Sequence, residues 1–134
     1  MGPLVHFELT RDWARETGLD AVAERIALAD ASVDVEFPAR GSLLNLTRHF
    51  APWAYGWVWY YRRRALRMRS PEALGRALHA AQDAVAHGVF GLAHVRFDLK
   101  IGRNPDDWEA APSRVRDRIQ ERTLRILRAY RSSL

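Results

Sequence analysis

The segment LGRALHAAQDAVAH, residues 74–87, sets the fold that we expect for this protein. His79, Asp83 and His87 recur every four residues, and residues at that spacing lie one turn apart on the same face of an α-helix. The intervening residues are mostly small and apolar, so we expect this face to lie against a core. A buried, unpartnered carboxylate costs more free energy than a small domain can tolerate, and a metal ion resolves that conflict.

This pattern predicts a buried helix with a metal-binding face. The alternative is that His79 and His87 are hydrogen-bonded core residues and that Asp83 is half exposed. Imidazole and carboxylate ligands without thiolate suit zinc, and iron or manganese as well.

Helical periodicity continues on both sides of this segment. We expect helices over residues 5–16, 19–33, 52–68, 71–87 and 112–131, with Ser70 and Pro71 at the start of the fourth. The segment 42–50 is ambiguous, and 89–111 is expected to be irregular because glycine and proline interrupt it. The predicted fold class is all-α: one domain over residues 1–134, a compact bundle of about five helices around a buried His/Asp metal cluster.

The composition narrows the chemistry of any site. The chain of 134 residues has no cysteine, which excludes disulfides and thiolate metal sites. Its net charge of +5 comes almost entirely from arginine, and such charge attracts phosphate-bearing ligands, although GC-rich codon usage also explains it. We see no signal peptide and no apolar run of membrane-spanning length, so we expect a cytoplasmic protein.

The segment 74–87 resembles the signature helix of the zinc-dependent phospholipase C and single-strand-specific nuclease superfamily, in its Het-C-like branch. Two further pieces follow the order found in that family. The first is HFELT at residues 6–10 with IALAD at 26–30 and Val33-Asp34, and the second is TRHF at residues 47–50. The resemblance spans residues 6–94.

The resemblance implies a role for every histidine of the chain. Asp34, His49, His79 and Asp83 would hold a first zinc ion, and Asp83 would bridge to a second ion that His6 also binds. His87 and His94 would belong to a third, with Asp98 as its candidate carboxylate. The implied metal ligands are therefore His6, Asp34, His49, His79, Asp83, His87, His94 and Asp98, and the implied catalytic residues are Asp34 and Asp83.

One ligand position has a rival in the sequence, and the N-terminus differs from that of the family. Asp30 lies one helical turn before Asp34 and is the rival for its role. Secreted members of the family also use the amino group of a mature N-terminal tryptophan as a ligand, where this sequence has Met1.

The resemblance implies metal-assisted hydrolysis of a phosphoester, in which the ions activate water and neutralise phosphate oxygens. The expected cofactor is zinc, as two or three ions, and the expected substrate is a phosphate-containing small molecule, a phospholipid or a nucleic acid. Two alternatives retain the metal site but assign it a different function. One is an iron enzyme with redox chemistry, and the other is a non-catalytic interaction domain that the metal holds together.

Aromatic and basic residues concentrate between positions 53 and 69. Such a combination can stack bases and neutralise phosphates. We favour a simpler interpretation, in which the aromatic side of a helix is core and the arginines reach past it to solvent.

Overall fold

The computed structural model describes residues 1–134, and all of its regular secondary structure is helical. The predicted all-α class is confirmed, but seven α-helices are present where we expected about five. None of them is both long and apolar enough to cross a lipid bilayer. The elements are η1 (Leu4–Leu9), α1 (Thr10–Glu16), η2 (Asp20–Val22), α2 (Ala23–Glu36), α3 (Leu43–His49), α4 (Ala54–Met68), α5 (Pro71–Ala86), α6 (Leu92–Asp98) and α7 (Ser113–Ser133).

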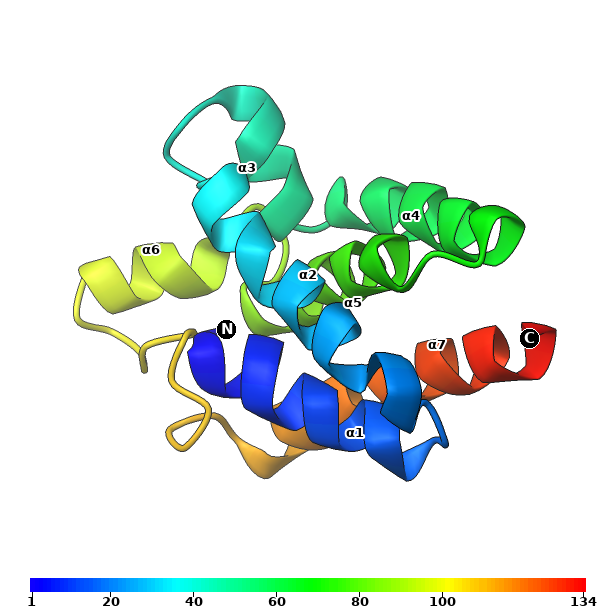
Figure 1. Cartoon of the computed structure of the whole chain (residues 1–134). Helices are drawn as coiled ribbons and strands as arrows, with labels where there is room; N and C mark the ends of the chain where they lie inside the picture. The colour runs from blue at the N-terminus through cyan, green and yellow to red at the C-terminus, as the bar shows by residue number, and fades with distance from the viewer.

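Helix α5 lies at the centre, with α2, α4 and α7 packed around it (Figure 1). It begins as the sequence predicts, because the Ser70 side chain accepts a hydrogen bond from the backbone N–H of Ala73 at 3.1 Å and Pro71 occupies the first turn. His79 and Asp83 are completely buried, and His87 at the end of the helix is 5% exposed. The predicted polar stripe therefore lies inside the core.

Three segments differ from the sequence-based expectation. The ambiguous segment 42–50 contains α3, which starts where the Ser42 side chain accepts from the Asn45 backbone N–H at 3.0 Å. The segment expected to be irregular contains α6, because Gly91 adopts a φ of 67° and lets a short helix follow. The predicted first helix is divided into the π-helix η1 and α1, and π turns are frequent at functional sites.

Helix α4 exposes most of its aromatic side chains. Trp53, Trp59 and Tyr60 are 46%, 62% and 44% exposed. The interpretation that the aromatic side of this helix is core holds for Tyr61, which is 8% exposed, and is wrong for these three rings, because Ala54, Tyr61 and Ala65 form the buried face of α4. The large rings consequently remain on the surface.

Gly75 allows α5 to approach α2 closely. A Cβ atom at this position would lie 2.8 Å from both the Ala29 side chain and the Asp30 backbone nitrogen, and it would also collide with the carbonyl oxygen of Ile26. The absence of a side chain at Gly75 therefore sets the distance between the two helices that carry Asp30, Asp34, His79 and Asp83.

We expect Gly75→Ala to lower the free energy of unfolding by about 1–3 kcal/mol, because the added methyl group must push α2 and α5 apart. Chemical denaturation of the metal-free protein measures this. Gly56→Ala is the matched control, since Gly56 lies exposed in helix α4 with nothing within 4 Å of its virtual Cβ. That variant should gain about 0.5–1 kcal/mol from helix propensity. Equal effects of the two substitutions would contradict the close-approach argument.

Candidate metal centre

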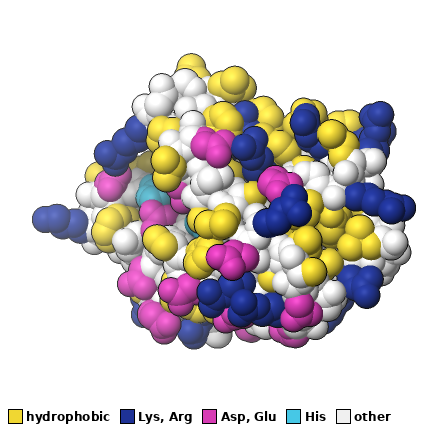
Figure 2. Space-filling model, in the orientation of Figure 1, with side chains coloured by type: hydrophobic (Ala, Val, Ile, Leu, Met, Phe, Trp, Pro, Cys, Tyr) yellow, Lys and Arg dark blue, Asp and Glu magenta, His cyan; other side chains and the backbone are white.

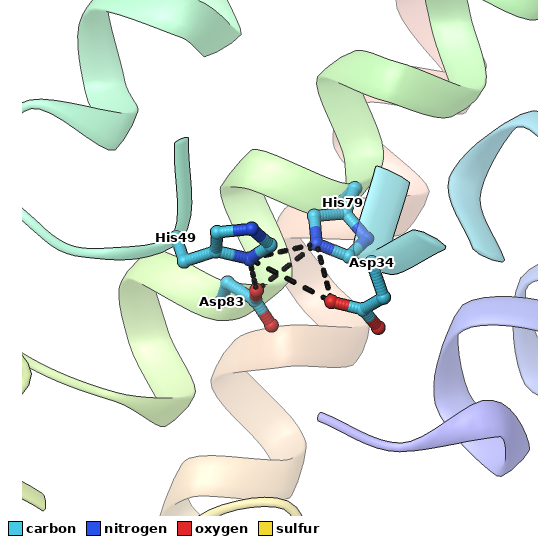
Figure 3. A group of neighbouring side chains, drawn as sticks. All are labelled: Asp34, His49, His79 and Asp83. Carbon is cyan, nitrogen blue, oxygen red and sulfur yellow. Dashed lines mark hydrogen bonds and ion pairs between the residues drawn. The ribbon is translucent and has the colours of Figure 1, made fainter. Parts of the chain in front are cut away.

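Four side chains from three helices meet on the buried face of α5 (Figure 3). His79 and Asp83 come from α5, His49 ends α3, and Asp34 comes from α2. Asp83 Oδ2 lies 2.7 Å from His49 Nδ1 and 3.0 Å from His79 Nε2. Asp34 Oδ1 lies 3.7 Å and 3.5 Å from the same two nitrogens. The structure thus brings together the four residues that the resemblance assigns to one ion.

The far side of each imidazole is fixed by a hydrogen bond to the backbone. His49 Nε2 donates to the carbonyl oxygen of Phe37 at 2.8 Å, and His79 Nδ1 donates to the carbonyl oxygen of Asp30 at 2.9 Å. A carbonyl oxygen can only accept, so these nitrogens carry the protons. The nitrogens that face Asp34 and Asp83 are therefore the ones whose lone pairs are available to a ligand.

Two imidazole lone pairs and two carboxylate oxygens consequently point at one another within 4.8 Å. Without a positive charge between them, such a buried arrangement is strongly unfavourable. Either a metal ion or added protons must balance it, and the same nitrogen atoms serve both purposes.

His6 faces the other oxygen of Asp83. Its Nδ1 is 2.8 Å from Gln82 Oε1 and 2.8 Å from Asp30 Oδ1, so Nδ1 carries the proton. Its Nε2 lies 3.2 Å from Asp83 Oδ1, is buried and has no hydrogen-bond partner. The two oxygens of Asp83 thus face different histidines, which is the arrangement that a bridging carboxylate requires.

Asp30, the rival of Asp34, lies behind the imidazoles rather than between them. It is fully buried, and its Oδ2 accepts a hydrogen bond from Thr10 Oγ1 at 2.8 Å. Its other oxygen is next to Nδ1 of His6 and of His79, the nitrogens that carry protons. Asp30 therefore orients two histidines, a role that carboxylates commonly have behind metal ligands, whereas Asp34 faces the lone pairs.

The four residues around Asp83 Oδ2 are called the first group, and His6 with Asp83 Oδ1 the second. A third group forms at the end of α5 from His87, His94 and Asp106. Asp106 Oδ1 is 3.0 Å from His87 Nε2, and Asp106 Oδ2 is 3.6 Å from His94 Nε2. Asp98, the carboxylate predicted for this site, is exposed and belongs to none of the three groups. Helix α6 carries both His94 and Asp98, but the loop after it folds back and places Asp106 between the two imidazoles.

The amino group of Met1 links the second and third groups. It donates to Asp83 Oδ1 at 2.9 Å and to Asp106 Oδ1 at 3.1 Å, and it lies 3.3 Å from His87 Nε2. A positively charged group therefore already occupies the space between these two carboxylates.

Charge governs protonation throughout the centre. Burial opposes the charged form of His79, but the carboxylates of Asp83 and Asp30 outweigh it and raise the pKa of His79 to about 10. Burial likewise works against ionisation of Asp83, but the surrounding positive charges hold the pKa of Asp83 well below its usual range. Asp106 also has a lowered pKa, chiefly because His87 donates a hydrogen bond to it.

The centre reaches the surface on one side. Asp34 is 51% exposed and Asp106 is 43% exposed, whereas Asp83 and His79 are inaccessible. Figure 2 shows a histidine side chain at the bottom of a recess on this face, with acidic side chains beside it. Water can therefore reach the centre from the side of the two exposed carboxylates.

Sequence reasoning missed Asp106, the supporting role of Asp30, and Gln82. Gln82 donates to Thr10 and Thr123 while its oxygen accepts from His6, so it fixes the orientation of that ring. Gln82 lies on the apolar segment 74–87, and its burial there was the available signal. Asp106 follows Asn104 and Pro105 in a loop, where no periodicity indicates which way a side chain faces.

No family model matches the chain, and no solved structure matches it. The tRNA pseudouridine synthase A of Methylobacterium sp. (strain 4-46) is 33% identical over 127 residues, which cover 87% of this chain and 46% of that protein. The chain thus spans about half the length of the curated relative that it matches. The resemblance to the phospholipase C and nuclease superfamily stays a prediction.

We expect zinc binding to release protons at neutral pH. In the metal-free protein His79, with its pKa raised to about 10, carries a proton on Nε2 at pH 7.5, and zinc must displace it. The apparent affinity for zinc therefore rises with pH up to about 10. The protonated His79 stabilises the metal-free fold in full below about pH 6.5, and this contribution is lost progressively as the pH rises to about 10. Calorimetric titration in buffers of different ionisation enthalpy counts the protons.

His79→Asn serves as the control, because any zinc that it still binds should be taken up with about one proton fewer released per chain. Zinc binding that releases no protons between pH 7 and 8 would contradict the proposed ligand atoms.

Proposed function

We propose that this protein is a metal-dependent phosphoester hydrolase whose site holds a cluster of zinc ions. One observation carries the proposal: lone pairs from His49 and His79 and oxygens of Asp34 and Asp83 converge in the core while backbone carbonyls fix the rear of each imidazole. The donor set, with no thiolate, suits zinc, and carboxylate or carbonyl partners behind ligating histidines are typical of zinc sites.

The second and third groups would hold additional ions if the Met1 amino group, which lies between them, lost its proton and became a ligand itself. The buried Nε2 of His6 lacks any hydrogen-bond partner, and it faces Asp83 Oδ1. His87, His94 and Asp106 supply two imidazoles and a carboxylate within 4.8 Å. Clustered ions of this kind lower the pKa of bound water and neutralise phosphate oxygens.

Asp34 and Asp83 have different roles in the proposed reaction. Asp34 is the exposed member of the first group, so it is placed to accept a hydrogen bond from an attacking water molecule and to orient it. Asp83 is inaccessible and holds its charge at neutral pH, so it contributes fixed negative charge rather than proton transfer. Water enters beside Asp34, Asp106 and the partly exposed His94, and the buried ligands stay dry.

A groove beside α4, lined by none of the proposed metal ligands, favours a substrate with planar rings. It has a volume of about 1260 Å³ and lies between α4 and the first half of α5. Exposed Trp59 and Tyr60 line it together with Arg64 and Arg76, and Arg76 lies one helical turn before the ligand His79. Rings beside arginines bind stacked bases and their phosphates. Among the expected substrates, this groove favours a nucleic acid over a small phosphoester or a phospholipid.

Metal content and turnover test the proposal together. We expect about two to three zinc ions per chain, and phosphodiesterase activity that depends on them. His79→Ala should lose both, because it removes a ligand at the centre of the first group. Elemental analysis of protein purified without chelators, followed by a model phosphodiester assay, gives the answer.

Carboxylate variants sharpen that test. Asp34→Ala and Asp106→Ala should each lower metal content, whereas Asp98→Ala should leave it unchanged, since Asp98 lies outside all three groups. Bound iron would favour the redox alternative. Bound zinc that stabilises the fold without phosphodiesterase turnover would favour the non-catalytic alternative, and a protein that takes up no metal would contradict the proposal altogether.

Binding of single-stranded nucleic acid tests the groove. We expect Trp59→Ala to weaken binding of a single-stranded oligonucleotide to the metal-stripped protein about 5- to 150-fold, the equivalent of about 1–3 kcal/mol for one lost stacking contact. Fluorescence anisotropy measures it, with transfer RNA as a second probe because the curated relative is named for it. Tyr55→Ala is the control, since Tyr55 is also exposed on α4, at 43%, but does not line the groove. Equal losses for both variants, or stronger binding to phosphatidylcholine vesicles, would argue against a nucleic-acid groove.

A further inference from the structure

Arg48 is a buried cation that forms no ion pair with a carboxylate. It is 9% exposed, and its guanidinium lies 3.9 Å from the ring centroid of Phe37 and 3.8 Å from that of Trp57. One nitrogen donates to the Tyr61 hydroxyl at 2.7 Å, while Nε is buried without a partner. A buried charge in such surroundings costs free energy, so its presence calls for a reason that the fold alone does not supply.

The contacts of Arg48 lead directly to the metal centre. Phe37 is the residue that ends α2, and its carbonyl oxygen accepts the hydrogen bond from His49 Nε2 at 2.8 Å. The ring of this same Phe37 is held from one side by Arg48, which precedes His49 in the chain. The stack of Phe37, Arg48 and Trp57 therefore fixes the carbonyl that determines which nitrogen of His49 faces Asp83.

A second contact holds the same end of α3. The indole N–H of Trp57 donates to Thr47 Oγ1 at 2.9 Å. The last residues of α3 are thus tied to α4 through Thr47 and Arg48, and to the end of α2 through Arg48 and His49. His49 lies where these ties meet.

We infer that Arg48 is a positioning residue for the metal centre: by stacking on Phe37 it holds the Phe37 carbonyl against His49 Nε2 and keeps His49 Nδ1 directed at the ligand site. A planar guanidinium stacks between two rings and donates to Tyr61 at the same time, which the ammonium group of lysine does not do. This role rests on the metal centre proposed above, and it does not depend on which substrate is hydrolysed.

Cobalt(II) substitution tests the inference, because the visible absorption of the ion reports the geometry of its ligands. We expect Arg48→Met and Arg48→Lys to change the cobalt spectrum and to weaken metal binding by about tenfold or more, the usual effect of losing a partner that orients a ligand. Phe37→Leu, which keeps the carbonyl but removes the ring, should do the same. The double variant Arg48→Met/Phe37→Leu should be little worse than either single one, because the two residues act as a unit.

Arg76→Met is the matched control. It removes another arginine beside the same ring, but the Arg76 guanidinium lies 5.7 Å from the Phe37 centroid and pairs with Glu36 on the surface. Its cobalt spectrum should match that of the original protein. Spectra are compared at temperatures where circular dichroism shows every variant to be folded, so that a general loss of stability does not imitate the effect.

Each outcome has a defined meaning. A cobalt spectrum and affinity that stay unchanged in folded Arg48→Met would overturn the positioning role while leaving the metal centre intact. Arg76→Met with the same spectral change as Arg48→Met would also overturn it, because a general effect of charge would then explain both. An original protein that binds no cobalt would overturn the proposed function together with this inference.

Discussion

The Asp83 carboxylate is completely buried in the central helix, and the arrangement around it follows from the cost of that burial. Positive or hydrogen-bonding groups reach it from several elements: His79 from α5 itself, His49 from α3, His6 from η1, and the amino group of Met1. Removing any of them leaves charge less compensated in the core. The packing of α5 against its neighbours therefore depends on a charge balance as well as on apolar contact.

Periodicity predicted the part of the centre that lies on one helix. The spacing of His79, Asp83 and His87 fixed their common face, and the small residues between them indicated its burial, so the core of the site could be read from 14 residues. Ligands and supporting groups on other elements cannot be predicted from helical spacing. Phe37 contributes a backbone carbonyl, which no sequence pattern marks, and Asp106 rather than Asp98 reaches His87 because a loop turns back.

Helix α4 is a second case in which periodicity alone does not predict burial. An amphipathic pattern indicates which residues share a face, but the neighbouring helix decides how deep that face lies. Here α4 approaches α5 through alanines, and Trp53, Trp59 and Tyr60 remain outside. We expected from its sequence that this helix buries its aromatic side in the core. It also forms one wall of a groove.

The two oxygens of Asp83 face different histidines, and this has a thermodynamic consequence. Two ions held through this carboxylate, as in the proposed cluster, would not bind independently, because each would withdraw electron density from the group that the other uses, while both would relieve the same uncompensated charge. Their affinities would be linked by a coupling free energy that acts equally in both directions. The proposed cluster would then fill over a range of metal concentration that reflects the pair, and no single dissociation constant would belong to either position.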